Sequence, residues 1–118
     1  MNANARRLEF ISRAAKTVMR RIDYLSRYGG EEFAAVLPAT TKAEALKLAE
    51  RLRDVIDKET SSNWQSVVPK KVTVSVGVAT FPEDAEDKEK LIFCADGALY
   101  EAKRSGKNQV RGYNKPPS

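Results

Sequence analysis

The stretch Arg27-Tyr28-Gly29-Gly30-Glu31-Glu32-Phe33 decides how the rest of the chain is interpreted. It joins a short β-prone run, residues 22–28, to an apolar run, residues 33–37. Adjacent glycines adopt positive φ without a Cβ penalty, so they suit the two-residue turn of a tight β-hairpin. The two carboxylates that follow point to opposite sides of a strand. Two interpretations stay open: a tip that holds a metal ion and phosphates, or a plain turn with solvated glutamates.

The composition is that of one globular domain. The 118 residues are 42% hydrophobic and 31% charged, which excludes a disordered chain. No apolar run approaches the roughly 20 residues of a membrane span, and no secretory signal is visible. Cys94 is the only cysteine and histidine is absent. We therefore expect no disulfide framework, no zinc site and a cytoplasmic location.

The formal net charge of +5 raises the question of polyanionic partners. Basic residues are spread along the chain, with local concentrations at 20–21, 70–71 and 103–111. This spread is more typical of phosphate ligands and solvated helix faces than of a nucleic-acid stripe. DNA or RNA binding is therefore the weakest alternative, and the salt dependence of any DNA affinity would test it.

Periodicity predicts three helices and a further strand. Apolar residues recur at helical spacing over 7–21, over 41–58 after the capping box Thr41-Lys42-Ala43-Glu44, and over 91–104 before Ser105-Gly106. Valines alternate with small residues over 72–78, which predicts a strand with close packing on its small face.

The remaining segments are less regular. Residues 109–113 predict a short edge strand, and 60–69, with its lone Trp64, predict a loop. Residues 1–5 are expected to be disordered or extraneous, and 114–118 to be a tail. The element order predicts one α+β domain over 6–113 with an antiparallel hairpin.

Three separated motifs resemble, in this order, the GGDEF domain of diguanylate cyclases. They are the opening stretch, then Ser75-Val76-Gly77 in the valine strand, then Asp96-Gly97-Ala98-Leu99-Tyr100-Glu101-Ala102-Lys103 with Gly106-Lys107-Asn108. The resemblance runs from about Leu8 to Gly112. It implies a palm-like, ferredoxin-like sheet related to nucleotide cyclases, with helices on its face. It also implies condensation of two GTP molecules into cyclic di-GMP with release of pyrophosphate.

The resemblance assigns roles at the hairpin. Glu31 occupies the family's metal-ligand position, and Glu32 the adjacent acidic position tied to metal binding and activation of the attacking hydroxyl. Such transfers use two divalent ions, here Mg²⁺ or Mn²⁺, and hard Mg²⁺ prefers carboxylate oxygens. Gly29 and Gly30 would let the backbone approach GTP.

The resemblance also implies roles for two sets of residues outside the hairpin. Lys103 and Lys107 match the ligands of the terminal phosphates of GTP. The second is often arginine in relatives, so here its contact would be a point charge and not a fork. Arg20 and Asp23 match the RxxD inhibitory motif that binds the product, and Arg51 matches a secondary product-binding arginine. The plainer alternative is a helix-end ion pair between Arg20 and Asp23, with a solvated Arg51.

The front of the family's domain has no counterpart in this sequence. There the resemblance expects a strand with an aspartate metal ligand, a helix with an asparagine for guanine, and a Gly-Asp pair where this chain has Asn4-Ala5. The absent strand would lie between the hairpin and the 72–78 strand. We favour a fragment of a longer protein over two alternatives, completion of the sheet by another chain and rearrangement of the remaining elements.

These absences set the functional expectations. We expect the chain alone to lack cyclase activity, since one metal ligand and the guanine contacts are missing. The active form is expected to be a homodimer with one GTP in each subunit, preceded by a sensory or receiver domain. The alternative is a degenerate module that acts as a receptor for cyclic di-GMP or GTP.

Overall fold

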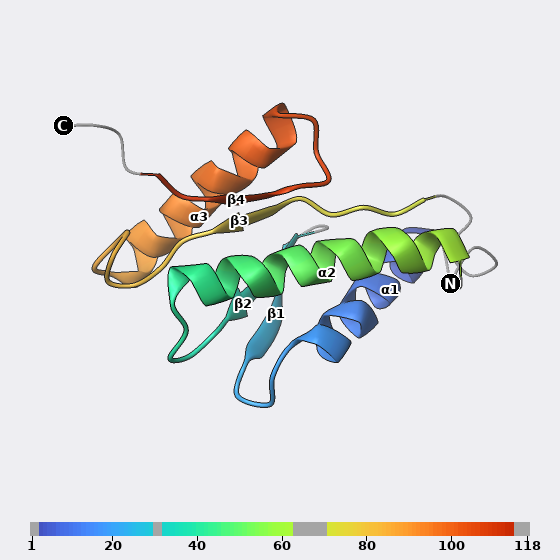
Figure 1. Cartoon of the computed structure of the whole chain (residues 1–118), viewed down its shortest axis with the longest axis horizontal. Helices are drawn as coiled ribbons and strands as arrows, with labels where there is room; N and C mark the ends of the chain where they lie inside the picture. Colours follow the sequence, from blue (N-terminus) through green and yellow to red (C-terminus); the bar gives the residue numbers. More distant parts are fainter. Residues whose placement is uncertain (1–2, 30–31, 63–70, 115–118) are drawn as a thin grey trace.

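The computed structural model describes residues 3–29, 32–62 and 71–114. The fold is α+β, as predicted, with the helices and strands in the expected order (Figure 1). No helix in the described part of the chain is long and apolar enough to cross a membrane. The elements are α1 (Ala3–Val18), β1 (Tyr24–Gly29), β2 (Glu32–Val36), α2 (Lys42–Ser62), β3 (Val76–Val78), α3 (Lys88–Arg104) and β4 (Val110–Gly112).

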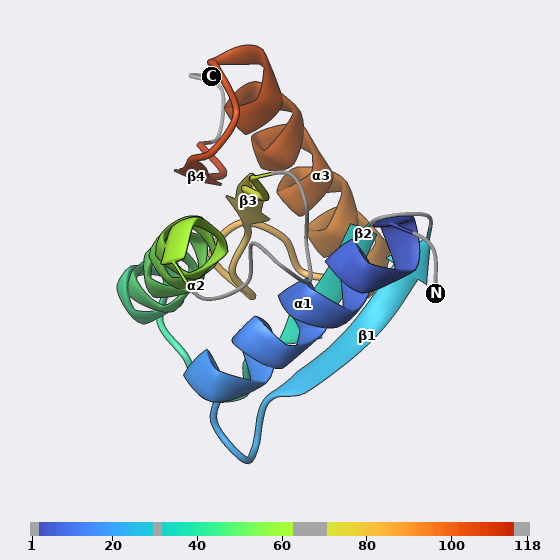
Figure 2. The ribbon, with the colours of Figure 1, turned by 90° about the vertical axis from the view of Figure 1, so that its right-hand side faces the viewer.

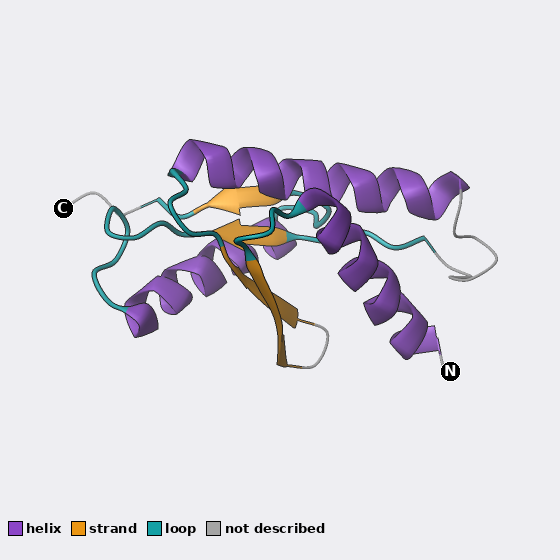
Figure 3. Ribbon diagram, turned by 90° about the horizontal axis from the view of Figure 1, so that it is seen from below, coloured by secondary structure: helices purple, strands orange, loops and turns teal. Residues whose placement is uncertain are grey.

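The strands form two separate two-stranded sheets. β1 and β2 pair antiparallel as the predicted hairpin, and β3 pairs in parallel with β4, the predicted edge strand. Figure 3 shows the hairpin extending away from β3 and β4. This separation is the arrangement expected if a strand between the hairpin and the 72–78 segment is absent.

β3 and β4 lie between α2 and α3 (Figure 2). Val78 packs against α2 with the buried Ala45 and Ala49. Gly77 faces α3 so closely that a Cβ there would lie 2.2 Å from the carbonyl oxygen of Ala95 and 2.3 Å from the amide nitrogen of Leu99. The close packing predicted for the small face of this strand is therefore confirmed, and α3 backbone supplies it.

α1 packs against the C-terminal half of α2. Phe10 and Ala14 of α1, Ile56 of α2 and Val72 form a buried cluster, in which Phe10 is 1% exposed. The strand predicted over 72–78 is shorter than expected, because β4 pairs with only its last three residues. Val72 lies before this ladder and still contributes to the core.

Helix bounds differ from the prediction at several ends, among them the end of α1, which lies at Val18 and not at residue 21. α1 begins at Ala3, so it includes three of the five residues expected to lie outside the domain. α2 continues to Ser62, beyond the predicted end at residue 58 and into the predicted 60–69 loop. The rest of that loop, with Trp64, lies outside the described residues. A polar terminal turn carries no apolar periodicity, so the pattern stops before the helix does.

The predicted helix caps are confirmed. Glu44 Oε1 accepts from the Thr41 amide at 3.0 Å, and Thr41 Oγ1 accepts from the Glu44 amide at 3.2 Å, the two bonds of a capping box. α3 ends with Ser105 as its C-cap, followed by Gly106 at φ 114°, where glycine avoids a Cβ clash.

Lys42 ties the start of α2 to two later segments. Its Nζ donates to Asp84 Oδ1 at 2.8 Å and to the Tyr113 carbonyl at 2.9 Å. Asp84 is buried and also accepts from the Thr80 amide through Oδ2. Burial lowers the pKa of Lys42, but Asp84 and Glu83 outweigh it, so the net pKa is raised and the ammonium stays charged. These bonds fix the end of the sheet at which β3 and β4 finish.

Candidate functional site

The hairpin tip lies between Gly29 and Glu32, which are opposite each other in the ladder. The register shifts between Arg27 and Gly29, because Arg27 is opposite Phe33 and Gly29 is opposite Glu32, so β1 has one residue more than β2 at this point. Gly29 therefore belongs to β1, whereas we expected it to be part of a Gly29-Gly30 turn. Gly30 and Glu31 lie outside the described residues, and only the backbone of Glu32 is described. Their roles in metal and GTP binding stay predictions.

The base of the hairpin carries exposed apolar side chains. Tyr24 is 69% and Val36 is 63% exposed, and the two are opposite each other in the register. Ile22, just before β1, is exposed as well. These exposures show that this face lacks a packing partner among the described residues. A partner that covered it would contribute roughly 25 cal/mol per Å² of apolar area buried.

Arg20 and Asp23 lie together in the connection between α1 and β1. The Asp23 carboxylate accepts from Arg20 Nη2 at 2.8 Å, from Nε, and from the Arg20 amide at 2.7 Å. Its side chain has no exposed area, while that of Arg20 is 40% exposed. Hydrogen bonding by Arg20 holds the pKa of Asp23 below its usual value. The ion pair of the plainer alternative is therefore present.

Arg20 also closes the base of the hairpin. Its Nη2 donates to the Pro38 carbonyl at 3.3 Å and to Thr40 Oγ1, which both follow β2. Nη1 has no hydrogen-bond partner within the described ranges, so one edge of the guanidinium is open to a ligand. Arg51 is exposed on α2, about 14 Å along the helix axis from Lys42. No hydrogen bond or ion pair between described residues joins Arg51 to Arg20 or Asp23.

The two lysines expected to contact phosphates lie at one end of α3. Lys103 is in its last turn, and Lys107 follows in the loop that leads to β4. Both side chains are exposed. Lys107 has φ 62° and the next residue, Asn108, has φ 50°, so both are in the left-handed region that disfavours residues other than glycine. The structure thus places both lysines near the C-terminal end of α3 and one of them on an unusual backbone.

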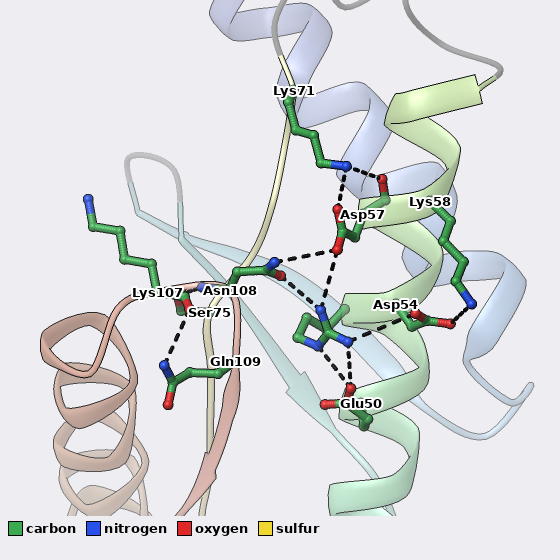
Figure 4. Close-up of polar contacts among 10 residues, drawn as sticks. Glu50, Asp54, Asp57, Lys58, Lys71, Ser75, Lys107, Asn108 and Gln109 are labelled. Carbon is green, nitrogen blue, oxygen red and sulfur yellow. Dashed lines mark hydrogen bonds and ion pairs between the residues drawn. The ribbon is translucent and has the colours of Figure 1, made fainter.

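A polar cluster that the sequence did not reveal holds this loop. The Asn108 cluster consists of Arg53 and Asp57 of α2, Ser75 before β3, and Asn108 itself (Figure 4). Arg53 and Asp57 are four residues apart in a helix, a spacing that signals an ion pair. No sequence signal links them to Asn108, which is more than 50 residues away.

The described residues by themselves offer no set of side chains that would hold a metal ion. No group of three or more carboxylate, thiol or imidazole side chains gathers within the described ranges. The carboxylates predicted to hold Mg²⁺ are those of Glu31 and Glu32, whose side chains lie outside the described residues, and carboxylate oxygens are the ligands that this ion prefers. Two carboxylates would supply part of a ligand set, and the remaining ligands would be water, substrate phosphate or other groups.

An α+β fold with a Gly-Gly-Glu-Glu-Phe hairpin is that of a small palm-like domain. The chain belongs to the GGDEF family, because the family described as "Diguanylate cyclase, GGDEF domain" matches residues 5–109. The resemblance drawn from the three motifs is therefore confirmed.

Individual relatives agree. The probable diguanylate cyclase DgcT of Escherichia coli strain K12 is 41% identical over 88 residues, which are 75% of this chain and 20% of DgcT. The active GGEEF domain of a diguanylate cyclase from Vibrio cholerae is similar at a TM-score of 0.83 and 27% identity, covering 95% of this chain and 69% of that chain. The GGDEF domain of DgcB from Caulobacter crescentus, in complex with c-di-GMP, is similar at 0.73 and 26%, covering 90% and 62%.

Proposed function

We propose that this chain is part of the catalytic domain of a diguanylate cyclase, which condenses two GTP molecules into cyclic di-GMP and releases pyrophosphate. The Gly-Gly-Glu-Glu-Phe hairpin, in a chain that the GGDEF family matches over residues 5–109, carries this proposal. The relative from Vibrio cholerae, described as an active GGEEF domain, supports it further. Because the chain spans a fifth of DgcT, the activity of the whole protein is part of the proposal.

The proposed reaction gives one role to the residues of the hairpin and another to the lysines near the end of α3. In each half-reaction a ribose 3′-oxygen bonds to an α-phosphorus in line, and the bond from that phosphorus to the leaving pyrophosphate breaks. Glu31 and Glu32 would hold Mg²⁺ or Mn²⁺, which lowers the pKa of the attacking hydroxyl and neutralises phosphate charge. Lys103 and Lys107 bind the β- and γ-phosphates, whose negative charge departs with pyrophosphate. Gly29 and Gly30 leave room for the nucleotide beside the backbone.

Two subunits must cooperate, because cyclic di-GMP contains two nucleotides and each site binds one GTP. We therefore infer a homodimer with its two half-sites facing each other. A sensory or receiver domain earlier in the protein would bring the half-sites together.

The chain alone is expected to show no turnover, since the donors at the hairpin make only part of a metal site. The test incubates the chain with GTP and Mg²⁺ and separates the products by chromatography. Formation of cyclic di-GMP by the isolated chain would contradict this expectation. A longer protein that includes the chain should form it, and loss of that activity in Glu32→Gln would support the assigned role.

Product binding at Arg20 is the second part of the proposal. The open Nη1 edge of Arg20 suits a guanine edge or a phosphate, with Asp23 and Arg51 as further contacts. Calorimetry with cyclic di-GMP should show weaker binding for Arg20→Ala. The matched control is Arg13→Ala, which removes an exposed arginine of α1 paired with Glu9. Equal affinities of the unmodified chain and Arg20→Ala would exclude this site.

Measurements on a longer protein that includes this chain would distinguish a receptor from an enzyme. A degenerate module would bind cyclic di-GMP or GTP there without turnover. Binding of cyclic di-GMP by the longer protein, together with absent cyclase activity, would favour the receptor over the enzyme.

A further inference from the structure

Three successive residues after α3 have positive φ: Gly106 at 114°, Lys107 at 62° and Asn108 at 50°. Glycine adopts such angles freely, but the Cβ of Lys107 crowds its own backbone in the left-handed region and makes that conformation costly. A backbone of this kind persists only where surrounding contacts determine it. The contacts that hold Lys107 in this conformation are therefore informative about its role.

Asn108 supplies those contacts. Its amide donates to Ser75 Oγ at 3.1 Å, its Oδ1 accepts from Arg53 Nη1 at 3.0 Å, and its Nδ2 donates to Asp57 Oδ2 at 3.4 Å. The Lys107 amide donates to the Ala102 carbonyl at 3.0 Å. The loop is thus bonded to α3 on one side, to the chain before β3 on another, and to α2 on a third.

The α2 side of the Asn108 cluster is fixed in turn by its own neighbours. The Arg53 side chain is 17% exposed and also donates to Glu50 Oε1 at 2.6 and 2.9 Å. Asp57 is paired with Lys71. Hydrogen bonds from Lys71 and Asn108 hold the pKa of Asp57 below its usual value, so its carboxylate is charged at neutral pH. Arg53 and Asp57 therefore present a fixed donor and a fixed acceptor to the amide group of Asn108.

The side chain of Lys107 leaves the loop in the opposite direction. Figure 4 shows it extending away from Asp57, while Asn108 points toward Asp57. Within the described part of the chain, no carboxylate pairs with the Lys107 ammonium. The cluster thus fixes the backbone of a lysine whose charge is directed to solvent.

We propose that Arg53 and Asp57, acting through Asn108, are positioning residues that hold the Lys107 ammonium in place for a terminal phosphate of a nucleoside triphosphate. This inference rests on the proposed function, in which Lys107 contacts that phosphate. A lysine has several rotatable bonds and a point charge, so a fixed backbone is what restricts the region its charge can reach. The three residues act on binding through Lys107 and touch no substrate themselves.

The first experiment compares the binding of GTP and GMP, both with Mg²⁺, by calorimetry. GMP lacks the terminal phosphates, so it reports contacts to the rest of the nucleotide. Lys107→Ala should weaken GTP binding about tenfold, the size of a charged hydrogen bond, and leave GMP binding unchanged. Arg53→Met and Asn108→Gly should weaken GTP binding about three- to tenfold, again without an effect on GMP. Glycine at 108 keeps the left-handed backbone accessible, so that variant tests the side-chain bonds alone.

The control variant is Lys58→Ala. It removes the ion pair of Lys58 with Asp54 on the same helix and leaves the bonds of Asn108 intact. GTP and GMP binding should both stay within about twofold of the unmodified chain, the typical effect of an exposed pair.

A double-mutant cycle separates positioning from a purely structural role. If Asn108 acts through Lys107, Asn108→Gly should have no further effect on GTP binding in the Lys107→Ala background. A structural role would weaken GTP and GMP alike and would persist in that background, and either result would overturn the inference.

Hydrogen exchange tests the loop without a ligand. The Lys107 and Asn108 amides are both hydrogen-bonded, so Arg53→Met should speed their exchange about three- to tenfold while the amides in the middle of α3 stay protected. Unchanged exchange at both amides would overturn the positioning inference alone. Equal affinity of the unmodified chain for GTP and GMP would overturn the proposed phosphate contact of Lys107, and this inference with it.

Discussion

The two sheets of this protein have the same number of strands but opposite surroundings. β3 and β4 have α2 on one face and the backbone of α3 against Gly77 on the other. The hairpin of β1 and β2 exposes Tyr24 and Val36 at its base, and its Cα atoms approach no other described helix or strand within 8 Å. One sheet is part of a packed core, and the other is held by its own ladder and a polar closure.

The residues that stabilise the fold and the acidic residues of the proposed reaction therefore lie in different parts of the chain. We call α1, α2 and residues 71–114 the packed part of the chain, and the buried residues of both clusters lie in it. The hairpin carries the acidic residues of the proposed reaction, while the packed part carries Lys103 and Lys107. The proposed site therefore needs the hairpin to be placed correctly against a core that it does not help to build.

The largest expected effect compares one aromatic residue from each part. Phe10→Ala should lower the free energy of unfolding by about 3–5 kcal/mol, since the ring is fully buried and its loss leaves a cavity. Tyr24→Ala should change it by no more than about 0.5 kcal/mol, because the ring is exposed. Urea unfolding followed by circular dichroism measures both. Similar losses in the two variants would show that the hairpin is packed in solution.

The second effect compares two glycines at α3. Gly77→Ala should lower stability by about 1–3 kcal/mol or more, because its Cβ would overlap backbone atoms that cannot turn aside. Gly97→Ala should raise stability by about 0.5–1 kcal/mol, since no atom lies within 4 Å of a Cβ there and alanine favours the helix. Thermal unfolding of the two variants gives opposite shifts. A harmless alanine at 77 would contradict the close approach of α3 to β3.

The smallest effect concerns the polar closure of the hairpin. Because Arg20 depresses the pKa of Asp23, the folded state binds the proton less tightly than the unfolded state. The contribution of the pair to stability is therefore fully present above the unfolded pKa, about 3.9, and is lost as the pH falls through the lower folded value. Asp23→Asn should lower the urea midpoint at pH 7, and the difference from the unmodified chain should shrink below about pH 4. A difference that is equal at pH 7 and pH 3 would show that the pair does not stabilise the fold.

Local signals in the sequence predicted local features well. The adjacent glycines predicted the hairpin, the Thr41–Glu44 spacing predicted the capping box, and the small face of 72–78 predicted the tight contact at Gly77. Each depends on residues within a few positions of one another or on the size of a single residue. Gly29 was expected in the turn but belongs to β1, because the irregularity between Arg27 and Gly29 has no sequence signature.

Features that join distant segments could not be predicted. The bonds from Asn108 to Arg53 and Asp57 span more than 50 residues, and nothing in a helical charge pair indicates which loop it meets. The side chains of Arg20 and Asp23 are close in sequence, so their pairing could be anticipated, but the bonds to Pro38 and Thr40 could not. The separation into two sheets was not predicted, since the resemblance implied a single sheet and the periodicity of a strand does not name its neighbours.

The contact of Lys42 with Tyr113 has a consequence for where the structural unit stops. The family match ends at residue 109, yet the Tyr113 amide donates to the Val78 carbonyl at 2.8 Å and the Tyr113 carbonyl accepts from Lys42. A recombinant chain cut at the end of the match would lose β4, and the ammonium of Lys42, which is paired with the buried Asp84, would lose the Tyr113 carbonyl as an acceptor. The boundary for truncation or fusion therefore falls after Tyr113, and a reporter protein joined there would leave both bonds in place.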